Sequence, residues 1–230
     1  MNKFAIKKYF SNSEDGNVAF HVGLDIDEAQ RNRQKFCQKH KINGAKLIWM
    51  EQTHSCNIEI VTKNSQLPIK NCDAIITNEV DLPLLVMVAD CIPILIYDAN
   101  KNIIAAVHSG RNGTFLKILE KTLEKMRDVF GSDANDIHIE FGPNIGFCCY
   151  EVNEEMAKIV QESFGKQFEK NRKIDLIGIN LKMAEEFGIK KENIKVSDVC
   201  TYCGGENYFS YRKDKKCGRF CGIICIQKAI

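Results

Sequence analysis

The chain has 230 residues, of which 44% are hydrophobic and 27% are charged, and its formal net charge is +2 at pH 7. This length suits one well-buried domain, and the nearly balanced charge gives no reason to expect binding to nucleic acid or to a membrane surface. No apolar run approaches the roughly 20 residues of a membrane span, and the N-terminus shows no secretory signal, so we expect a cytoplasmic protein.

In chain order, the apolar patterns predict strands and helices that are mixed along the sequence. We expect an extended lead-in at 4–22 with a polar turn at 11–16, a helix at 25–40, and strands at 47–50, 58–61, 74–77 and 84–88. Strands at 92–97 and 103–107 follow, then a helix at 115–130, a strand at 137–141, helices at 153–164 and 179–187, and closing strands at 194–196 and 222–227. Because the elements do not alternate regularly, they favour an α+β (mixed α/β) fold, with a single domain over 1–230 of mixed β-sheets flanked by helices.

Two of these elements carry more detailed predictions. The strands at 84–88, 92–97 and 103–107 are nearly continuous apolar runs, which indicates interior strands buried on both faces. The helix at 115–130 is amphipathic, with Leu116 and Leu119 among the residues of its apolar stripe. The sequence gives no further sign of oligomeric state, and we expect a monomer or a homodimer.

The stretch 86–113 is the part around which the rest of the chain is organised. The strands at 92–97 and 103–107 flank a polar turn, 98–101, and this arrangement predicts a β-hairpin. Pro93 lacks the N–H that a sheet ladder needs, and so indicates an edge strand or a bulge.

The hairpin places candidate metal ligands near one another. A four-residue loop pairs Tyr97 with Asn102, and the same register sets Cys91 opposite His108, with Cβ atoms roughly 4.5–5.5 Å apart. His54 also follows a short apolar strand in turn-like sequence. Two histidines, one cysteine and an open position are typical of catalytic zinc, which lowers the pKa of a bound water to roughly 7. The alternative is two polar turn histidines and a buried cysteine with no metal.

Arginines are the candidates for binding an anion, because the planar guanidinium matches phosphate oxygens. The candidates are Arg111, Arg212 and Arg219. Arg111 is the first choice, since it lies in a glycine-bounded turn close to His108. The alternative for each is a solvated surface charge.

Six motifs follow one another along the chain: QTHS (52–55), ADCIPILIYD (89–98), AAVHSG (105–110), GPNIGFCCYEV (142–152), CTYC (200–203) and FSYRKD (209–214). Through them the chain resembles the multicopper-polyphenol-oxidase-like family, also called the YfiH or laccase-domain family, whose members are regarded as purine nucleoside phosphorylases. The resemblance covers nearly the whole chain, from the helix that contains Asn32 to Arg219. It implies that His54, Cys91 and His108 bind zinc.

The resemblance also implies roles for other residues, and it has two departures. We expect Asn32, Arg111 and Arg212 to contact substrate, and Cys91, His108 and Arg111 to take part in catalysis. The family has an arginine before a glycine-rich turn near its N-terminus, whereas this chain reads FSNSEDG at 10–16. The family's Gly-Trp-Arg-Gly turn reads Gly-Arg-Asn-Gly at 110–113. These departures leave the phosphate-binding residues and the substrate preference open.

The chain has eleven cysteines, which in a reducing compartment are typically buried apolar residues or metal ligands rather than disulfides. Cys200 and Cys203 are followed by Cys217 and Cys221, a spacing that resembles a four-cysteine zinc site. Only the first pair recurs in the family, which favours the alternative of free thiols packed around a closing strand.

The function implied by the resemblance is zinc-dependent phosphorolysis of adenosine, inosine, guanosine and S-methyl-5'-thioadenosine, with adenosine deamination as a further activity. Glu51 and Asp90 are the acidic residues nearest the ligands in sequence. The alternatives are a Cys–His hydrolase or amidase with Cys91 as nucleophile and His108 as base, or a peptidoglycan-precursor editing role. Copper polyphenol oxidation is disfavoured, because a multicopper site uses about ten histidines and the chain has five, although a single copper ion could bind.

Overall fold

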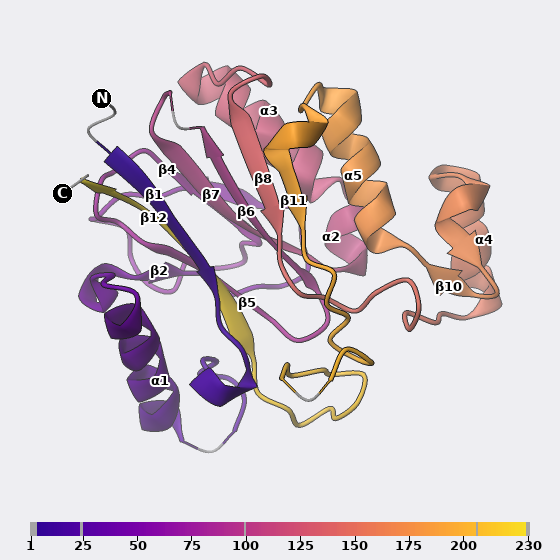
Figure 1. Ribbon diagram of the computed structural model, residues 1–230, viewed down its shortest axis with the longest axis horizontal. Helices are drawn as coiled ribbons and strands as arrows, with labels where there is room; N and C mark the ends of the chain where they lie inside the picture. Colours follow the sequence, from indigo (N-terminus) through magenta and orange to yellow (C-terminus); the bar gives the residue numbers. More distant parts are fainter. Residues whose placement is uncertain (1–3, 24, 99, 206, 229–230) are drawn as a thin grey trace.

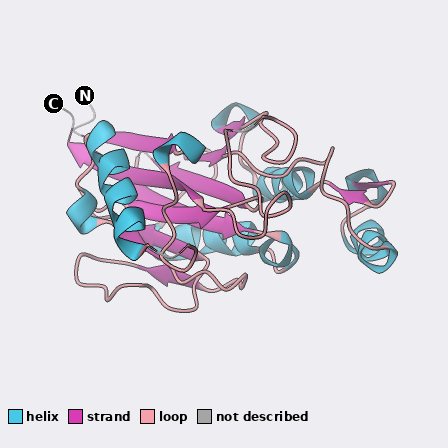
Figure 2. Ribbon diagram, turned by 90° about the horizontal axis from the view of Figure 1, so that it is seen from below, coloured by secondary structure: helices cyan, strands magenta, loops and turns pink. Residues whose placement is uncertain are grey.

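The computed structural model describes residues 4–23, 25–98, 100–205 and 207–228, and most of its strands belong to two mixed sheets that pack on each other (Figure 1). The strands run through the middle of the molecule and the helices lie outside them (Figure 2). This arrangement confirms the predicted mixed α/β fold. Among the helices of the described residues, none combines the length and the hydropathy of a membrane span.

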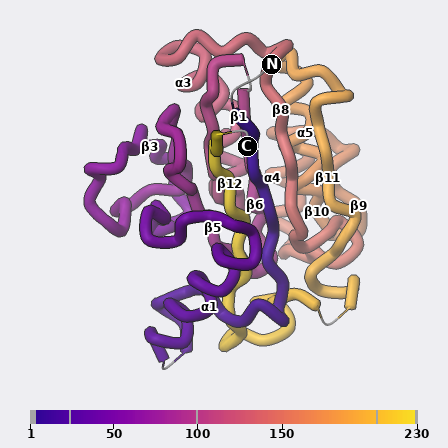
Figure 3. The backbone as a smooth tube through the Cα atoms, turned by 60° about the vertical axis from the view of Figure 1, so that its left-hand side comes forward, coloured from indigo at the N-terminus to yellow at the C-terminus, as the bar shows by residue number. Residues whose placement is uncertain are grey.

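The smaller sheet has the strand order β1 (Phe4–Phe10), β12 (Phe220–Lys228), β5 (Leu84–Val88) and β2 (Ile48–Trp49). The larger has the order β11 (Ile194–Val196), β8 (Ile137–Phe141), β6 (Ile92–Asp98), β7 (Ile103–Ser109), β4 (Ala74–Thr77) and β3 (Ile58–Ile60). The first and last strands, β1 and β12, lie side by side and antiparallel (Figure 3). As predicted, β5, β6 and β7 are interior strands, and nearly all of their residues are buried.

The helices are α1 (Ile26–Lys39), α2 (Arg111–Phe115), α3 (Ile118–Phe130), α4 (Glu154–Ser163) and α5 (Leu176–Phe187). Short 3-10 helices lie at Ser13–Asp15, Gly44–Lys46, Lys166–Phe168 and Lys191–Asn193, and a two-stranded ribbon pairs β9 (Glu169–Lys170) with β10 (Lys173–Ile174). No pattern in the sequence predicts this ribbon, because strands of two residues are too short to show one.

Three apolar clusters fill the spaces between the layers. The largest lies between the six-stranded sheet and helices α3 and α5, with Ile94 and Leu123 among its members. The second lies between the two sheets and contains Leu95 and Val86. The third packs Phe36 of α1 against the outer face of the smaller sheet. The alternation of Ile94 and Leu95 between two clusters shows why β6 must be apolar on both faces.

The hairpin of β6 and β7 forms, but its predicted register is wrong by two residues. Tyr97 pairs with Ile104 rather than with Asn102, so His108 lies opposite Pro93 instead of Cys91. Because side chains alternate with a period of two, this shift leaves Cys91 and His108 on the same side of the sheet.

The turn itself explains the shift. Oδ1 of Asp98 accepts hydrogen bonds from the backbone N–H groups of Asn100 and Lys101, both at 3.0 Å, which makes Asp98 the last strand residue. Asn102 has a φ of 53° and belongs to the turn. Side-chain caps of this kind set where a hairpin loop begins, and the alternation of apolar residues does not reveal them.

Pro93 lies in an interior strand, so the expectation of an edge strand or a bulge is wrong. The pairing of β6 with β8 begins one residue later, at Ile94 opposite Phe141. Proline is therefore tolerated because it lies at the end of that ladder, where its missing N–H breaks no pair. Its carbonyl accepts a hydrogen bond from the N–H of Gly142 at 2.9 Å.

Two predicted helices differ in their bounds. The helix expected at 115–130 begins only at Ile118, because Lys117 has a left-handed backbone with φ of 59° and separates α3 from the short helix α2, which ends at Phe115. The break turns Leu116 outward, with 46% of its surface exposed, whereas Leu119 is fully buried as predicted. The helix expected at 179–187 begins earlier, at Leu176, because Asp175 caps its first turn.

Candidate metal centre and its cavity

Cys91, His54 and His108 come together at one end of the six-stranded sheet. Their ligand atoms all lie within 4.8 Å of one another, and Sγ of Cys91 is 3.8 Å from Nε2 of His54. The two imidazole rings meet edge to face with centroids 4.8 Å apart. Zinc bonds cysteine sulfur at about 2.3 Å and histidine nitrogen at about 2.0–2.1 Å. The three predicted ligands are thus close enough to bind a single ion.

Asp73, which belongs to none of the six motifs in the sequence, organises this group. Its fully buried carboxylate accepts a hydrogen bond from Nδ1 of His108 at 2.7 Å. The same carboxylate accepts the backbone N–H groups of Thr53, His54 and Ser55 at 2.7–3.1 Å, and the hydroxyl of Ser55 at 2.7 Å. One side chain therefore fixes the loop that carries one histidine and the ring of the other.

The contact between Asp73 and His108 also decides which ring nitrogen of His108 faces the other two candidate ligands, His54 and Cys91. Because Nδ1 of His108 is engaged by the carboxylate, Nε2 is the nitrogen left for a metal. Metal-binding histidines typically donate their other ring N–H to a carboxylate in this way, which fixes their orientation and raises their basicity. The residues present therefore fit a bound metal ion. The sequence signal for Asp73 is weak, since it is a single acidic residue before the buried strand β4.

Gln52 attaches the same loop to the smaller sheet. Its side-chain Nε2 donates to the carbonyl of Met87 at 2.7 Å, and its Oε1 accepts the N–H of Met87 at 2.9 Å. The amide thus pairs with the end of β5 as a neighbouring strand would. His54 follows two residues later with a φ of 60°, a conformation that turns the chain toward Cys91.

The charges of Cys91 and His108 are coupled. Burial alone would raise the pKa of the Cys91 thiol, but the neighbouring His108 and His54 lower that pKa to about 6. Burial alone would lower the pKa of His108, but Cys91 and Asp73 raise it to about 9. At neutral pH, Cys91 is therefore a thiolate, the form that binds metals and that acts as a nucleophile.

A cavity of about 570 Å³ opens beside the three ligands. Its lining includes all three ligand residues, the aromatic side chains Tyr150 and Tyr211, and the arginines Arg111, Arg212 and Arg219. A space of this size with a few polar groups is typical of a small-molecule site. The predicted anion-binding arginines are thus brought to the same cavity as the predicted metal ligands.

The three arginines are held differently. Arg212 donates from Nη1 to the carbonyl of Glu151 at 2.9 Å and lies 5.1 Å from the ring centroid of Tyr150. Arg219 donates to the carbonyl of Cys217 at 2.8 Å. Arg111 donates to its neighbour Asn112, with both distances at 3.3 Å. Arg111 has the weakest contacts of the three, so its guanidinium is the most available to an anion.

Other predicted residues lie elsewhere or are already engaged. Asn32 does not line the cavity; its amide donates to the carbonyl of Asn17 at 2.9 Å. Glu51 is exposed and also lies outside the lining. Asp90 does line the cavity, but its carboxylate accepts the Thr201 hydroxyl at 2.6 Å and the Arg212 backbone N–H at 2.7 Å.

The four-cysteine group suggested by sequence spacing does not form. Cys221 is buried in β12, where its N–H bonds the hydroxyl of Ser11, and Cys217 lies beside Arg219. Cys200 and Cys203 instead lie near another pair, Cys148 and Cys149. Spacing along the chain could not reveal this pairing, because the two pairs are about fifty residues apart.

Comparisons with known proteins agree with this architecture. The family described as "multi-copper polyphenol oxidoreductase laccase" matches residues 7–227. A purine nucleoside phosphorylase of Clostridium acetobutylicum is 35% identical, with 97% of this chain and 92% of the relative aligned. Another from Campylobacter jejuni is 34% identical over 96% of this chain and 97% of the relative.

Solved structures share the fold. The crystal structure of a Bacillus licheniformis hypothetical protein, YfiH, superposes with a TM-score of 0.90 at 25% identity, covering 96% of this chain and 92% of that one. YlmD from Geobacillus stearothermophilus superposes with a TM-score of 0.87 at 22% identity, covering 98% of this chain and 93% of that one.

Proposed function

The chain belongs to the multi-copper polyphenol oxidoreductase laccase family, and from its relatives and its site we propose that it is a zinc-dependent purine nucleoside phosphorylase. The observation that carries this proposal is the placement of His54, Cys91 and His108 beside a cavity lined by arginines. Relatives that match nearly the whole chain are named purine nucleoside phosphorylases.

The cavity offers groups for each part of the two substrates. Its volume of about 570 Å³ suits a nucleoside together with phosphate, since small-molecule sites span roughly 300–1,000 Å³. Arg111 and Arg212 present guanidinium groups that match phosphate oxygens. The rings of Tyr150 and Tyr211 provide apolar faces on which a purine can stack.

In phosphorolysis, a phosphate oxygen forms a bond to C1′ of the ribose while the bond from C1′ to the purine nitrogen breaks. The electron pair of that bond leaves with the base, which takes up a proton. Arg111 and Arg212 would orient the phosphate for attack, a positioning role that is a large part of catalysis. When bound, zinc supplies Lewis-acid chemistry that stabilises negative charge and acidifies water.

The substrates that we propose are adenosine, inosine, guanosine and S-methyl-5'-thioadenosine. We prefer zinc to copper because two histidines, one cysteine and an open position are typical of catalytic zinc. Deamination of adenosine would use the same site without phosphate. It needs a proton shuttle, usually a carboxylate, and Asp90, whose carboxylate accepts hydrogen bonds from Thr201 and Arg212, is an acidic residue of the cavity lining.

A second candidate function, a Cys–His hydrolase or amidase, is favoured by one observation. The Cys91 thiolate lies beside His108, whose other ring nitrogen is held by Asp73 at 2.7 Å. A nucleophile, a base and a carboxylate that orients the base form the arrangement of a cysteine hydrolase. Such an enzyme needs no metal, so metal content separates the two functions.

The experiment that tests the proposal is incubation of metal-analysed protein with adenosine, with and without phosphate, followed by identification of products. Adenine and ribose 1-phosphate, formed only with phosphate, are the expected result. Inosine formed in both incubations would show deamination. Removal of zinc with a chelator should abolish phosphorolysis, and its return should restore it. Absence of both products from zinc-loaded protein would contradict the proposal.

A further inference from the structure

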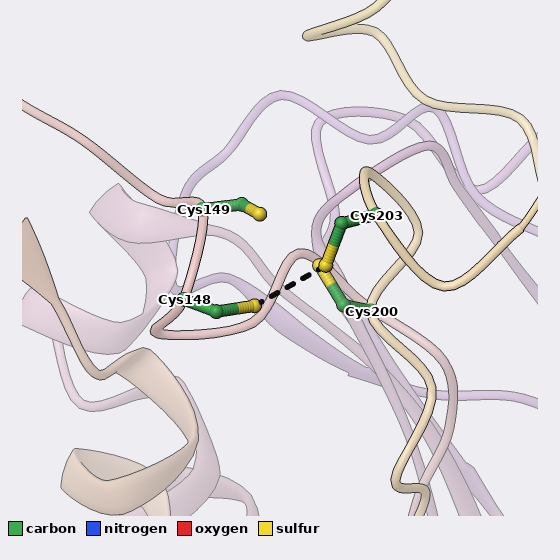
Figure 4. A group of neighbouring side chains, drawn as sticks. All are labelled: Cys148, Cys149, Cys200 and Cys203. Carbon is green, nitrogen blue, oxygen red and sulfur yellow. Dashed lines mark hydrogen bonds between the residues drawn. The ribbon is translucent and has the colours of Figure 1, made fainter.

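A second group of potential metal ligands lies apart from His54, Cys91 and His108. The Sγ atoms of the four cysteines at 148, 149, 200 and 203 all lie within 4.8 Å of one another. Those of Cys148 and Cys203 are 3.5 Å apart. Figure 4 shows that the cysteines come from two separate turns, and that their sulfur atoms point toward one another across the space between the turns. Each turn alone provides two thiols; the fold combines them.

We propose that Cys148, Cys149, Cys200 and Cys203 together bind one structural zinc ion. Four thiolates around a single ion form the closed set that structural zinc sites use. With zinc–sulfur bonds of about 2.3 Å, the sulfur atoms of a tetrahedral site lie roughly 3.8 Å apart, which is close to the spacing already present. All four residues are free cysteines in the structure.

The backbone of each turn explains how its two cysteines can face the same point. Cys200 and Cys203 have the two-residue separation that is usual for zinc ligands, and the N–H of Gly204 bonds the carbonyl of Cys200 at 2.7 Å to close their turn. Cys148 and Cys149 are adjacent in sequence, which is a closer spacing than that of Cys200 and Cys203. Their turn is closed by the N–H groups of Cys149 and Tyr150, which both donate to the carbonyl of Gly146 at 2.9–3.0 Å.

The groups around the cysteines also suit bound thiolates. The N–H of Gly146 donates to Sγ of Cys200 at 3.2 Å. Four thiolates and one divalent ion carry a net negative charge, and the Lys173 ammonium lies nearby, donating to the carbonyl of Cys148 at 2.6 Å. Such surrounding contacts strengthen metal binding.

The position of the site indicates what the ion would do. Residues 197–219, with 206 outside the described part, connect β11 to β12 without a helix or strand. Loops of this length are uncommon in a compact domain unless they serve a function. This one delivers Arg212 to the cavity, and the turn that carries Cys148 and Cys149 delivers Tyr150. Zinc between the two turns would hold together one wall of the cavity.

The test is metal analysis of three variants purified under reducing conditions with zinc present. Cys91→Ser should retain one zinc ion per chain, because the four-cysteine group is intact. The double variant Cys148→Ser/Cys203→Ser should lose that ion and keep the one at the histidine site. Cys217→Ser is the matched control, since Cys217 lies in the same loop but outside the group, and its zinc content should equal that of the wild type.

A second measurement keeps the test independent of folding and of activity. Replacement of zinc by Co²⁺ in Cys91→Ser should give the intense near-ultraviolet bands of four thiolate–cobalt bonds. Adding the single change Cys203→Ser, at an exposed residue, to Cys91→Ser should weaken those bands. Limited proteolysis should then cut residues 197–219 of the protein that carries Cys203→Ser faster than those of Cys217→Ser.

Three results would each overturn the proposal: Cys91→Ser protein that contains no zinc, iron in place of zinc, or a disulfide between Cys148 and Cys203 that persists after reduction. None of these outcomes depends on phosphorolysis.

Discussion

Oδ1 of Asp73 lies 2.7 Å from Nδ1 of His108, inside the protein, while the same carboxylate caps the loop that carries His54. The structure thus connects two of the three proposed ligands through one side chain. Asp73→Asn should weaken zinc binding at the histidine site by about 10- to 100-fold, the usual effect of removing the carboxylate partner of a metal-binding histidine. The measurement is competition for zinc with a chromophoric chelator.

Ser55→Ala is the matched control for Asp73→Asn. It removes one hydrogen bond to the same carboxylate, the 2.7 Å contact from the Ser55 hydroxyl, and leaves the contact with His108 intact. Its zinc affinity should stay within a few-fold of wild type. Equal losses in the two variants would mean that the loop, and not the orientation of His108, is what Asp73 contributes.

Gly110 lies where Cys91 and His54 leave no space for a side chain. A Cβ atom there would lie 2.8 Å from Sγ of Cys91 and 3.1 Å from Cδ2 of His54. Gly110→Ala should therefore displace a ligand and reduce zinc affinity at the histidine site by about tenfold or more. Gly113→Ala, in the helix α2 that follows Gly110, would meet the backbone carbonyl of His108 and the side chain of Ile118 at 3.3 Å but no ligand side chain, so it should lose less zinc affinity than Gly110→Ala. Retention of full affinity by Gly110→Ala in the chelator competition would show that the three ligands do not bind one ion.

Part of this site follows from the sequence alone, and part of it does not. The strands β4 to β7 follow from their apolar runs, and the shared side of Cys91 and His108 follows from the alternation of side chains along them. The register does not, because it depends on the Asp98 carboxylate accepting hydrogen bonds from the backbone N–H groups of Asn100 and Lys101, and other polar residues of the turn could have accepted such bonds instead. Asp73 was missed because its role comes from contacts across 18 to 35 residues of sequence.

Arg111 and Arg212 should differ in their effect on phosphate. Arg111 donates to Asn112 at 3.3 Å and is otherwise available, so Arg111→Ala should raise the KM for phosphate with zinc retained. A charged hydrogen bond contributes about 1.5–3 kcal/mol, which corresponds to roughly 10- to 150-fold. Steady-state kinetics at varied phosphate would measure this, and any deamination, which needs no phosphate, should be largely spared.

Two comparisons make the result for Arg111 specific. Arg212→Ala should raise KM and also lower thermal stability, because this side chain donates to the carbonyl of Glu151 and stacks on Tyr150. Arg127→Ala, at the end of α3 and outside the cavity lining, should change neither. An unchanged phosphate KM in Arg111→Ala would exclude this residue from the phosphate site.

His138 should make the protein less stable in mild acid. Its ring stacks on Tyr97 with centroids 4.7 Å apart, and burial, then the nearby Lys8, lower its pKa below the ordinary value. The folded state therefore favours the neutral ring, so its contribution is complete above the unfolded pKa of about 6.5 and is lost as the pH falls below it.

The measurement for His138 is thermal unfolding of wild type and His138→Phe between pH 7.5 and 5.5. Phenylalanine keeps the stacking on Tyr97 and cannot take up a proton. The melting temperature of the variant minus that of wild type should increase as the pH falls, whatever its value at pH 7.5. A constant difference across the range would mean that His138 titrates normally.

The last prediction decides between the two candidate functions through Cys91. If zinc is the centre of the chemistry, the Cys91 thiolate is a ligand, and Cys91→Ser replaces a strong soft ligand with a hydroxyl of similar size. Zinc at the histidine site and phosphorolysis should then fall together, because losing a ligand changes both metal affinity and the acidity of bound water. Zinc-loaded wild type should also resist iodoacetamide at Cys91, since a metal-bound thiolate is protected from alkylation.

The hydrolase function predicts the opposite pattern for the same residue. A thiolate with a pKa of about 6 beside His108 is a competent nucleophile without metal. Iodoacetamide would then label Cys91 with stoichiometric loss of activity, chelators would have no effect, and Cys91→Ser would be inactive although its zinc content at the histidine site is the same as that of wild type. Mass spectrometry of the labelled peptide, with zinc content measured on the same sample, distinguishes the two patterns. Because one thiolate cannot both hold the ion and attack a substrate, observing the second pattern would require the phosphorylase proposal to be abandoned.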